Sequence, residues 1–233
     1  IILSQVSSLE SLGVYSVAHR IAMTIYMFMN ALGRVWTPKL YEHLFEKKLD
    51  SNTRFLSVFM FISFFPSVVL ILFSKEVLLV FPESYSWGYK IIIFLSLYYS
   101  VLFIGKINGP QLIFAKQAWL LSGLSLVNIL ISILITYPLA SQYGAVGASA
   151  GMLISSIIMG VIYFYFANKY APLIWEYKTI VFLFLCLVIA SSTVFIVEET
   201  SIGSVSQFLI KLLILVVFSL YGFRMRFLRL SNF

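Results

Sequence analysis

Seven runs of mostly apolar residues follow one another along the chain, separated by short polar segments. They cover residues 14–36, 55–73, 89–114, 118–137, 145–167, 179–197 and 208–223. About 20 apolar residues in a helix cross the ~30 Å hydrocarbon core of a bilayer. The runs are continuously apolar, whereas membrane strands alternate apolar and polar residues over about 10 positions. The pattern therefore predicts an all-α polytopic transmembrane helical bundle with seven spans.

Composition supports the same interpretation. Apolar residues make up 61% of the 233 positions and charged residues only 11%, against roughly 25% charged in soluble domains. The single cysteine, Cys186, lies inside an apolar run, so the chain has neither a disulfide framework nor a cysteine-based metal site. These features exclude a soluble enzyme, a secreted disulfide scaffold and a disordered chain.

The segments between the spans predict an orientation. Eleven of the 16 Lys and Arg residues follow odd-numbered spans, and only Lys75 and Lys90 fall on the opposite side. Cytoplasmic loops of membrane proteins are the ones rich in Lys and Arg. We therefore expect the C-terminus in the cytoplasm and the N-terminus outside. The longest connection, residues 37–54, has apolar residues at helical spacing and predicts a short amphipathic helix on the cytoplasmic surface.

Three cations interrupt the apolar runs, where ionisable groups are costly and usually face a bundle interior or a wet cavity. Lys106 lies ~12 Å from the cytoplasmic end of the third run at 1.5 Å per residue. Gly105 and Pro110 weaken the helix around it, which predicts an interrupted helix and a cavity-lining lysine. Arg20 either reaches the headgroups or lines the same cavity. Lys211, near the external end of the last run, is expected to extend to the headgroups.

Arg20 and Arg34 lie on one face of the first span, and this face is about 80° wide. It also carries Thr24, Met27 and Ala31, and Asn30 is adjacent to it. Two interpretations are open. The face is either a helix–helix seam with basic ends or one wall of a cationic cavity. The second makes Arg20, Asn30, Arg34 and Lys106 the candidate substrate-binding residues.

The sequence gives no support for catalysis. The two histidines, His19 and His43, lie far apart, no acidic residue lies firmly inside a span, and no nucleophile, phosphate-loop or zinc motif occurs. We therefore expect no enzyme activity, cofactor or metal. Gly147, Gly151 and Ser155 recur every four residues and predict close helix packing.

Four short motifs resemble a known family. They are LGVYSVA at residues 12–18, WTPKLYE at 36–42, FSKEVL at 73–78 and YGAVGAS at 143–149. In this order and spacing they are similar to the polysaccharide transporter family, the O-antigen and capsule repeat-unit flippases. That family belongs to the multidrug/oligosaccharidyl-lipid/polysaccharide exporter superfamily. The last two spans carry no motif that resembles it.

The resemblance implies a fold of two six-helix lobes, often with two further helices at the C-terminus. Residues 1–168 would then be the second transmembrane lobe without its first helix, and residues 169–233 the two additional helices. If the full protein starts in the cytoplasm, an odd number of spans must precede the external N-terminus of this chain. This requirement agrees with a missing N-terminal lobe. The chain also starts with Ile1 rather than Met, and we expect it to be a piece of a longer protein.

The function implied by the resemblance is translocation of an undecaprenyl-pyrophosphate-linked oligosaccharide across the bacterial inner membrane. The expected partners are this anionic lipid-linked oligosaccharide, membrane lipids and the missing lobe, with no nucleic acid. Three alternatives remain open. A drug/cation antiporter of the same superfamily would more often carry intramembrane acids, and a membrane glycosyltransferase or ligase would need a larger external loop. A non-transporting membrane assembly subunit would have no wet cavity.

Overall fold

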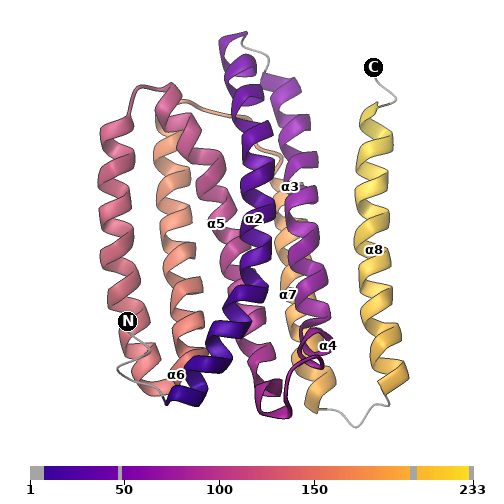
Figure 1. The fold of residues 1–233 in the computed structure, drawn as a ribbon. Coiled ribbons are helices and arrows are strands. Elements are labelled where there is room, and N and C mark those ends of the chain that lie inside the picture. Colours follow the sequence, from indigo (N-terminus) through magenta and orange to yellow (C-terminus); the bar gives the residue numbers. More distant parts are fainter. Residues whose placement is uncertain (1–7, 47–48, 200–203, 231–233) are drawn as a thin grey trace.

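The computed structural model describes residues 8–46, 49–199 and 204–230, and within these ranges it contains helices and no strand. The elements are α2 (Leu9–Phe45), α3 (Leu49–Leu72), α4 (Ser74–Leu78), the 3₁₀ helix η1 (Glu83–Gly88), α5 (Tyr89–Phe114), α6 (Ala118–Tyr170), α7 (Tyr177–Glu199) and α8 (Ser204–Leu230). The prediction of an all-α fold is confirmed for the described residues. The long helices stand side by side as an upright bundle (Figure 1).

The element α6 is a hairpin of two antiparallel helices. Gly144 has φ 59° and ψ −136°, a conformation outside the helical region that strongly favours glycine, and the chain reverses there (Figure 1). The two halves then pack closely. A Cβ atom on Gly151 would lie 2.7 Å from the Cα of Thr136, and one on Gly147 would lie 1.9 Å from the carbonyl oxygen of Leu139. The prediction of close packing at these two glycines is therefore confirmed.

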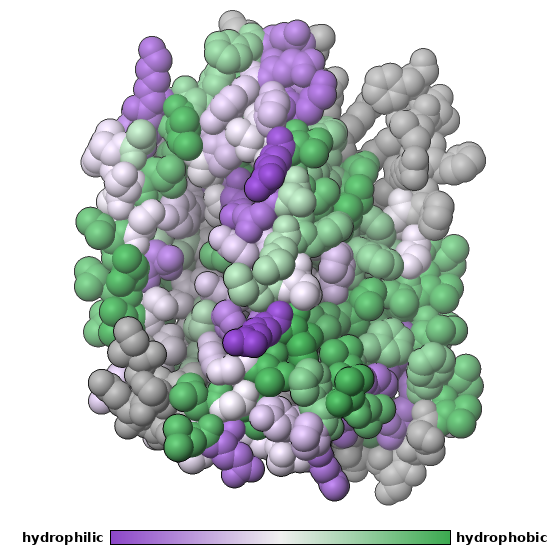
Figure 2. Space-filling model, viewed as in Figure 1, coloured by the Kyte–Doolittle hydropathy of each residue, from purple (hydrophilic) through white to green (hydrophobic). Residues whose placement is uncertain are grey.

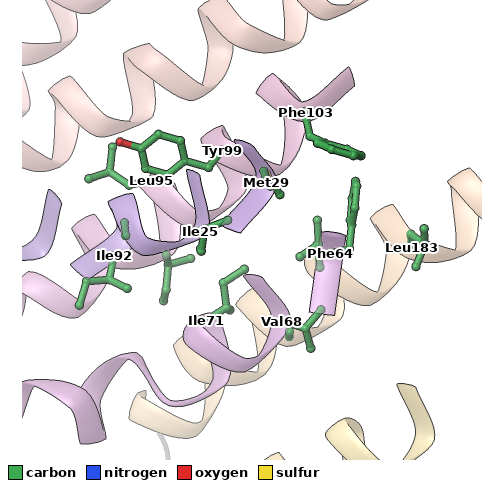
Figure 3. Packing of buried hydrophobic residues seen from close by; sticks show 14 of the residues in the cluster. Ile25, Met29, Phe64, Val68, Ile71, Ile92, Leu95, Tyr99, Phe103 and Leu183 are labelled. Atoms are coloured by element: carbon green, nitrogen blue, oxygen red, sulfur yellow. The ribbon is translucent and has the colours of Figure 1, made fainter. Parts of the chain in front are cut away.

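The apolar core lies where α2, α3, α5 and α7 meet (Figure 3). Ile25 of α2, Phe64 of α3 and Phe103 of α5 are at most 1% exposed, and Leu183 of α7 closes the cluster from the far side. Helices surrounded by lipid gain little from the hydrophobic effect when they associate, so dispersion contacts in a core of this kind hold them together. The cluster fixes how α2 and α5 face each other.

Five helical segments in the described part of the chain are long and apolar enough to cross a membrane. They are Phe55–Leu72, Glu83–Phe114, Ala118–Tyr170, Tyr177–Val197 and Val205–Gly222. The third has 53 residues and folds back at Gly144, so its length suits two crossings. Helix α2 is not among the five because His19, Arg20 and Asn30 lower its mean hydropathy. The count of seven spans and their orientation stay predictions.

Two expectations about helix continuity are wrong. In the described part of residues 37–54 no separate surface helix forms, because α2 continues through Pro38 to Phe45 and α3 begins at Leu49. Its apolar side packs on neighbouring helices, and the Trp36 ring stacks on Phe55 of α3 with centroids 5.7 Å apart. Helix α5 is likewise uninterrupted around Lys106, with Pro110 inside it. Neighbouring helices bury this segment, and such packing lets a membrane helix tolerate proline.

Candidate functional site

The side chain of Lys106 connects α5 to α2 near the middle of the bundle. Its Nζ donates a hydrogen bond to Oδ1 of Asn30 and lies 4.6 Å from the centroid of the Tyr26 ring. Lys106 and Asn30 are both half-buried. The structure therefore brings together two of the four residues that the sequence singled out, and it adds Tyr26 as a cation–π partner. We call Tyr26, Asn30 and Lys106 the lysine cluster.

A row of aromatic side chains extends the same seam along α2 and α5. The Tyr99 hydroxyl lies 3.1 Å from Nε2 of His19, and the Tyr99 and Tyr26 rings have centroids 5.7 Å apart. Tyr15 stacks on His19 at 5.7 Å. Sequence reasoning missed the three tyrosines, and it considered His19 only as a metal ligand. Tyr99 and Lys106 are seven positions apart, which places both on one face of α5. This spacing could have indicated that Tyr99 belongs to the same seam as Lys106.

Arg20 and Arg34 lie on the exposed surface of α2 rather than in the lysine cluster. They are separated by 14 positions, which corresponds to about 21 Å along the helix axis at 1.5 Å per residue. Figure 2 shows hydrophilic side chains set in a largely apolar surface where α2 crosses this face of the molecule. In a bilayer, exposed guanidinium groups must meet water, headgroups or another protein surface. This face of α2 is therefore unsuited to contact with lipid tails.

Helix α5 carries further buried polar groups beyond the lysine cluster. Asn108 and Gln111 are fully buried. The Gln111 side chain donates to the carbonyl oxygen of Ala171, which ties α5 to the segment before α7. Neither side-chain polar atom of Asn108 has a hydrogen-bond partner among the described residues. The polar residues of α5 thus divide between the α2 seam and the interior.

The expectation for Lys211 is wrong. This residue does not extend to the headgroups: it is 2% exposed, and its Nζ lies 2.6 Å from Oε1 of Glu76. The physical reason is the packing of α8 on α3, where the Phe218 ring stacks on Phe61 at 4.8 Å and directs Lys211 towards α4. Burial lowers the pKa of the neighbouring Lys75, the positive charge of Lys211 lowers it further, and Glu76 raises it.

The lysine cluster is suited to bind an anion. An ammonium group has three N–H donors. Asn30 accepts from one of them, and the Tyr26 ring faces the cation without using a donor. The remaining donors can contact the oxygens of a phosphate or carboxylate. The arrangement offers a positive charge and hydrogen-bond donors.

Comparison with known proteins gives a weak similarity over part of the chain. No family model matches the chain. Over 174 residues it is 26% identical to the capsular polysaccharide biosynthesis protein CapF of Staphylococcus aureus, an alignment that covers 72% of this chain and 44% of that protein. The chain thus spans less than half the length of this relative.

Proposed function

We propose that the complete gene product moves an anionic lipid-linked oligosaccharide across a membrane. The substrate class is an undecaprenyl-pyrophosphate-linked oligosaccharide, carried from the cytoplasmic to the periplasmic leaflet of the bacterial inner membrane. The observation that supports this most strongly is the lysine cluster, which lies at the middle of an apolar bundle beside the exposed face of α2. The name of the similar protein gives the polysaccharide context.

Electrostatics explains why a cation is needed at this depth. Moving an unpaired ionised group from water into hydrocarbon costs tens of kcal/mol by solvation alone. A pyrophosphate can cross only if fixed positive charges and hydrogen-bond donors replace its water. Lys106 supplies such a charge in mid-bundle, and Arg20 and Arg34 supply two more about 21 Å apart on the neighbouring surface.

In this proposal the exposed face of α2 is one wall of a central cavity. A further part of the complete gene product, the missing lobe of the two-lobe family, forms the opposite wall. Rocking of the two walls would open the cavity alternately to each side. The pyrophosphate would pass from one cation to the next inside this cavity.

Lipid binding by the complete gene product in nanodiscs tests the proposal. Undecaprenyl pyrophosphate and uncharged undecaprenol share the same chain and differ in charge. We expect the pyrophosphate to bind at least 10-fold more tightly, with affinity falling as salt is raised. Equal affinity for the two lipids would overturn the proposal.

Complementation provides the second measurement. The complete gene, expressed in a capsule-producing strain that lacks its own repeat-unit flippase, should restore polysaccharide at the cell surface. Accumulation of lipid-linked saccharide in the inner leaflet despite normal protein abundance would oppose the proposal. If the protein were a non-transporting assembly subunit, the lipid-linked saccharide would accumulate in this way. A Lys106→Cys variant would then also fail to react with water-soluble thiol reagents.

A further inference from the structure

A second polar site lies on the neighbouring face of α5, where that helix meets both halves of α6. It is a pocket with about 60 Å³ of space open to water. Apolar side chains form part of its wall, and six residues supply polar groups: Tyr98, Asn128, Ser132, Ser155, Ser156 and Tyr163. All of these lie near the middle of their helices rather than at the ends. The pocket therefore occupies the depth at which membrane transporters commonly bind substrates.

The pocket adjoins the lysine cluster through α5. Tyr98 and Gly105 line the pocket, whereas the next residues along the helix, Tyr99 and Lys106, contact α2. Tyr98 and Gly105 are seven positions apart, as are Tyr99 and Lys106, so each pair shares one face of α5. The face that lines the pocket and the face that contacts α2 therefore run side by side along the helix. The ammonium group and the pocket are thus on adjoining faces of one helix turn.

Glycine packing explains why a pocket forms here. The two halves of α6 touch closely at Gly151 and Thr136 near the hairpin. One turn further, Ser155 faces the pocket together with Ser132 from the other half. On α5, Gly105 has no side chain, and a Cβ atom placed there would meet only Tyr163, at 4.0 Å. Small residues leave space that leucines would have filled.

Polar groups in the pocket have unused hydrogen-bonding capacity. The side chains of Asn128 and Ser132 have no hydrogen-bond partner among the described residues. The hydroxyls of Ser155 and Ser156 donate to carbonyl oxygens of their own helix, at 2.9 and 2.7 Å, and keep their acceptor lone pairs. Polar groups without partners are costly at membrane depth. Their presence indicates a polar occupant.

The chemistry of the wall limits that occupant to an uncharged molecule. No Asp, Glu, Lys or Arg lines the pocket, which disfavours both an isolated cation and an isolated anion. Hydroxyl and amide groups alternate with apolar surface from Val101, Leu102 and Met159. A sugar ring has this combination, because its edge carries hydroxyls and its faces carry C–H groups.

We propose that this pocket is a subsite for hydroxyl groups of the sugar that adjoins the pyrophosphate in a lipid-linked saccharide. The proposal rests on the proposed function. With the pyrophosphate on Lys106, the attached sugar reaches the adjoining face of α5. Asn128 donates to and accepts from its hydroxyls, and Ser132 adds a further contact. The rings of Tyr98 and Tyr163 border the sugar.

Two lipids that differ by one sugar test the subsite. The complete gene product in nanodiscs is titrated with undecaprenyl pyrophosphate and with undecaprenyl pyrophosphate bearing a single N-acetylglucosamine. Two neutral hydrogen bonds correspond to roughly a 10-fold difference in dissociation constant. We expect the wild-type protein to prefer the sugar-bearing lipid by about that factor.

Two variants and one control assign this preference to the pocket. Asn128→Leu replaces the amide by an apolar side chain with the same branching, and Gly105→Leu fills the space. Both should lose the preference and keep their affinity for undecaprenyl pyrophosphate within about 2-fold. Gly123→Leu is the matched control, because a Cβ atom at Gly123 meets nothing within 4 Å and the residue does not line the pocket. It should retain the preference.

The outcomes separate the two proposals. If the wild-type protein binds both pyrophosphates equally, or if both pocket variants keep the preference, the subsite is overturned and the pyrophosphate site at Lys106 stands. If the wild-type protein binds undecaprenyl pyrophosphate no better than undecaprenol, the proposed function fails and the subsite fails with it.

Discussion

Lys211 of α8 and Glu76 of α4 form an ion pair with 2.6 Å between Nζ and Oε1, and the lysine is almost completely buried. This contact ties the last helix to the segment that follows α3. Removing one member of a buried pair leaves the other charge without its partner. Replacing both members by neutral groups avoids that penalty.

We predict that Lys211→Ala lowers the free energy of unfolding by about 1–3 kcal/mol, below the full value for a buried pair because Glu76 is partly exposed. The measurement is thermal unfolding in detergent, followed by circular dichroism. Lys90→Ala, at an exposed position of α5, is the control and should change stability by less than about 0.5 kcal/mol. The double variant Lys211→Met with Glu76→Gln should recover much of the loss. A silent Lys211→Ala variant would contradict the buried pair.

The α6 hairpin gives a second prediction. Gly151→Leu should destabilise the protein by about 1–3 kcal/mol or more, because its Cβ atom would lie 2.7 Å from the backbone of Thr136. Gly123→Leu lies in the same element and meets open space, so it should be neutral or slightly stabilising. The readout is the temperature at which half of the protein aggregates in detergent. Equal temperatures for the two variants would show that the halves of α6 do not pack closely.

Much of the helix pattern could be predicted from the sequence. The predicted third run and α5 share the bounds Tyr89 and Phe114, and the fourth and fifth runs correspond to the two halves of α6. The reason is physical: a chain in hydrocarbon must satisfy its backbone hydrogen bonds within each span, so local hydropathy determines where helices form. Tertiary contacts have little influence on that outcome.

The contacts between helices were harder to predict. Helices that are apolar all round have no pattern to show which side faces a neighbour. The burial of Lys211 was missed for a related reason, because its partner Glu76 is 135 positions away in the sequence. The continuation of α2 was missed because proline usually ends a helix, whereas Pro38 lies inside α2. The pairing of Lys106 with Asn30 depends on the register between two parallel helices, and no local pattern encodes it. The four candidate residues were therefore recognisable by type, while the sequence left their arrangement open.

The orientation of the bundle gives a third prediction, from the unequal distribution of Lys and Arg between its two ends. Reporter fusions placed after Ser141 and after Gly203 should report the periplasm, and fusions after Asp50 and after Ala171 should report the cytoplasm. Alkaline phosphatase and green fluorescent protein give opposite signals on the two sides. A reversed result at one position would show a miscounted span between it and its neighbour.

Charge at Lys106 should matter more for transport than for folding, which is the fourth prediction. A charge-assisted hydrogen bond to phosphate is worth about 1.5–3 kcal/mol, so Lys106→Gln should weaken binding of undecaprenyl pyrophosphate roughly 10- to 100-fold. Lys106→Arg keeps the charge with different geometry and should retain part of the affinity. Asn30→Ala removes the partner but leaves the ammonium in place, so its effect should be smaller. Surface polysaccharide and membrane abundance are measured together in the complemented strain. Normal export by Lys106→Gln at normal membrane abundance would remove Lys106 from the site. Reduced abundance of this variant would instead give Lys106 a structural role, because the half-buried ammonium would then be needed to hold α5 against α2.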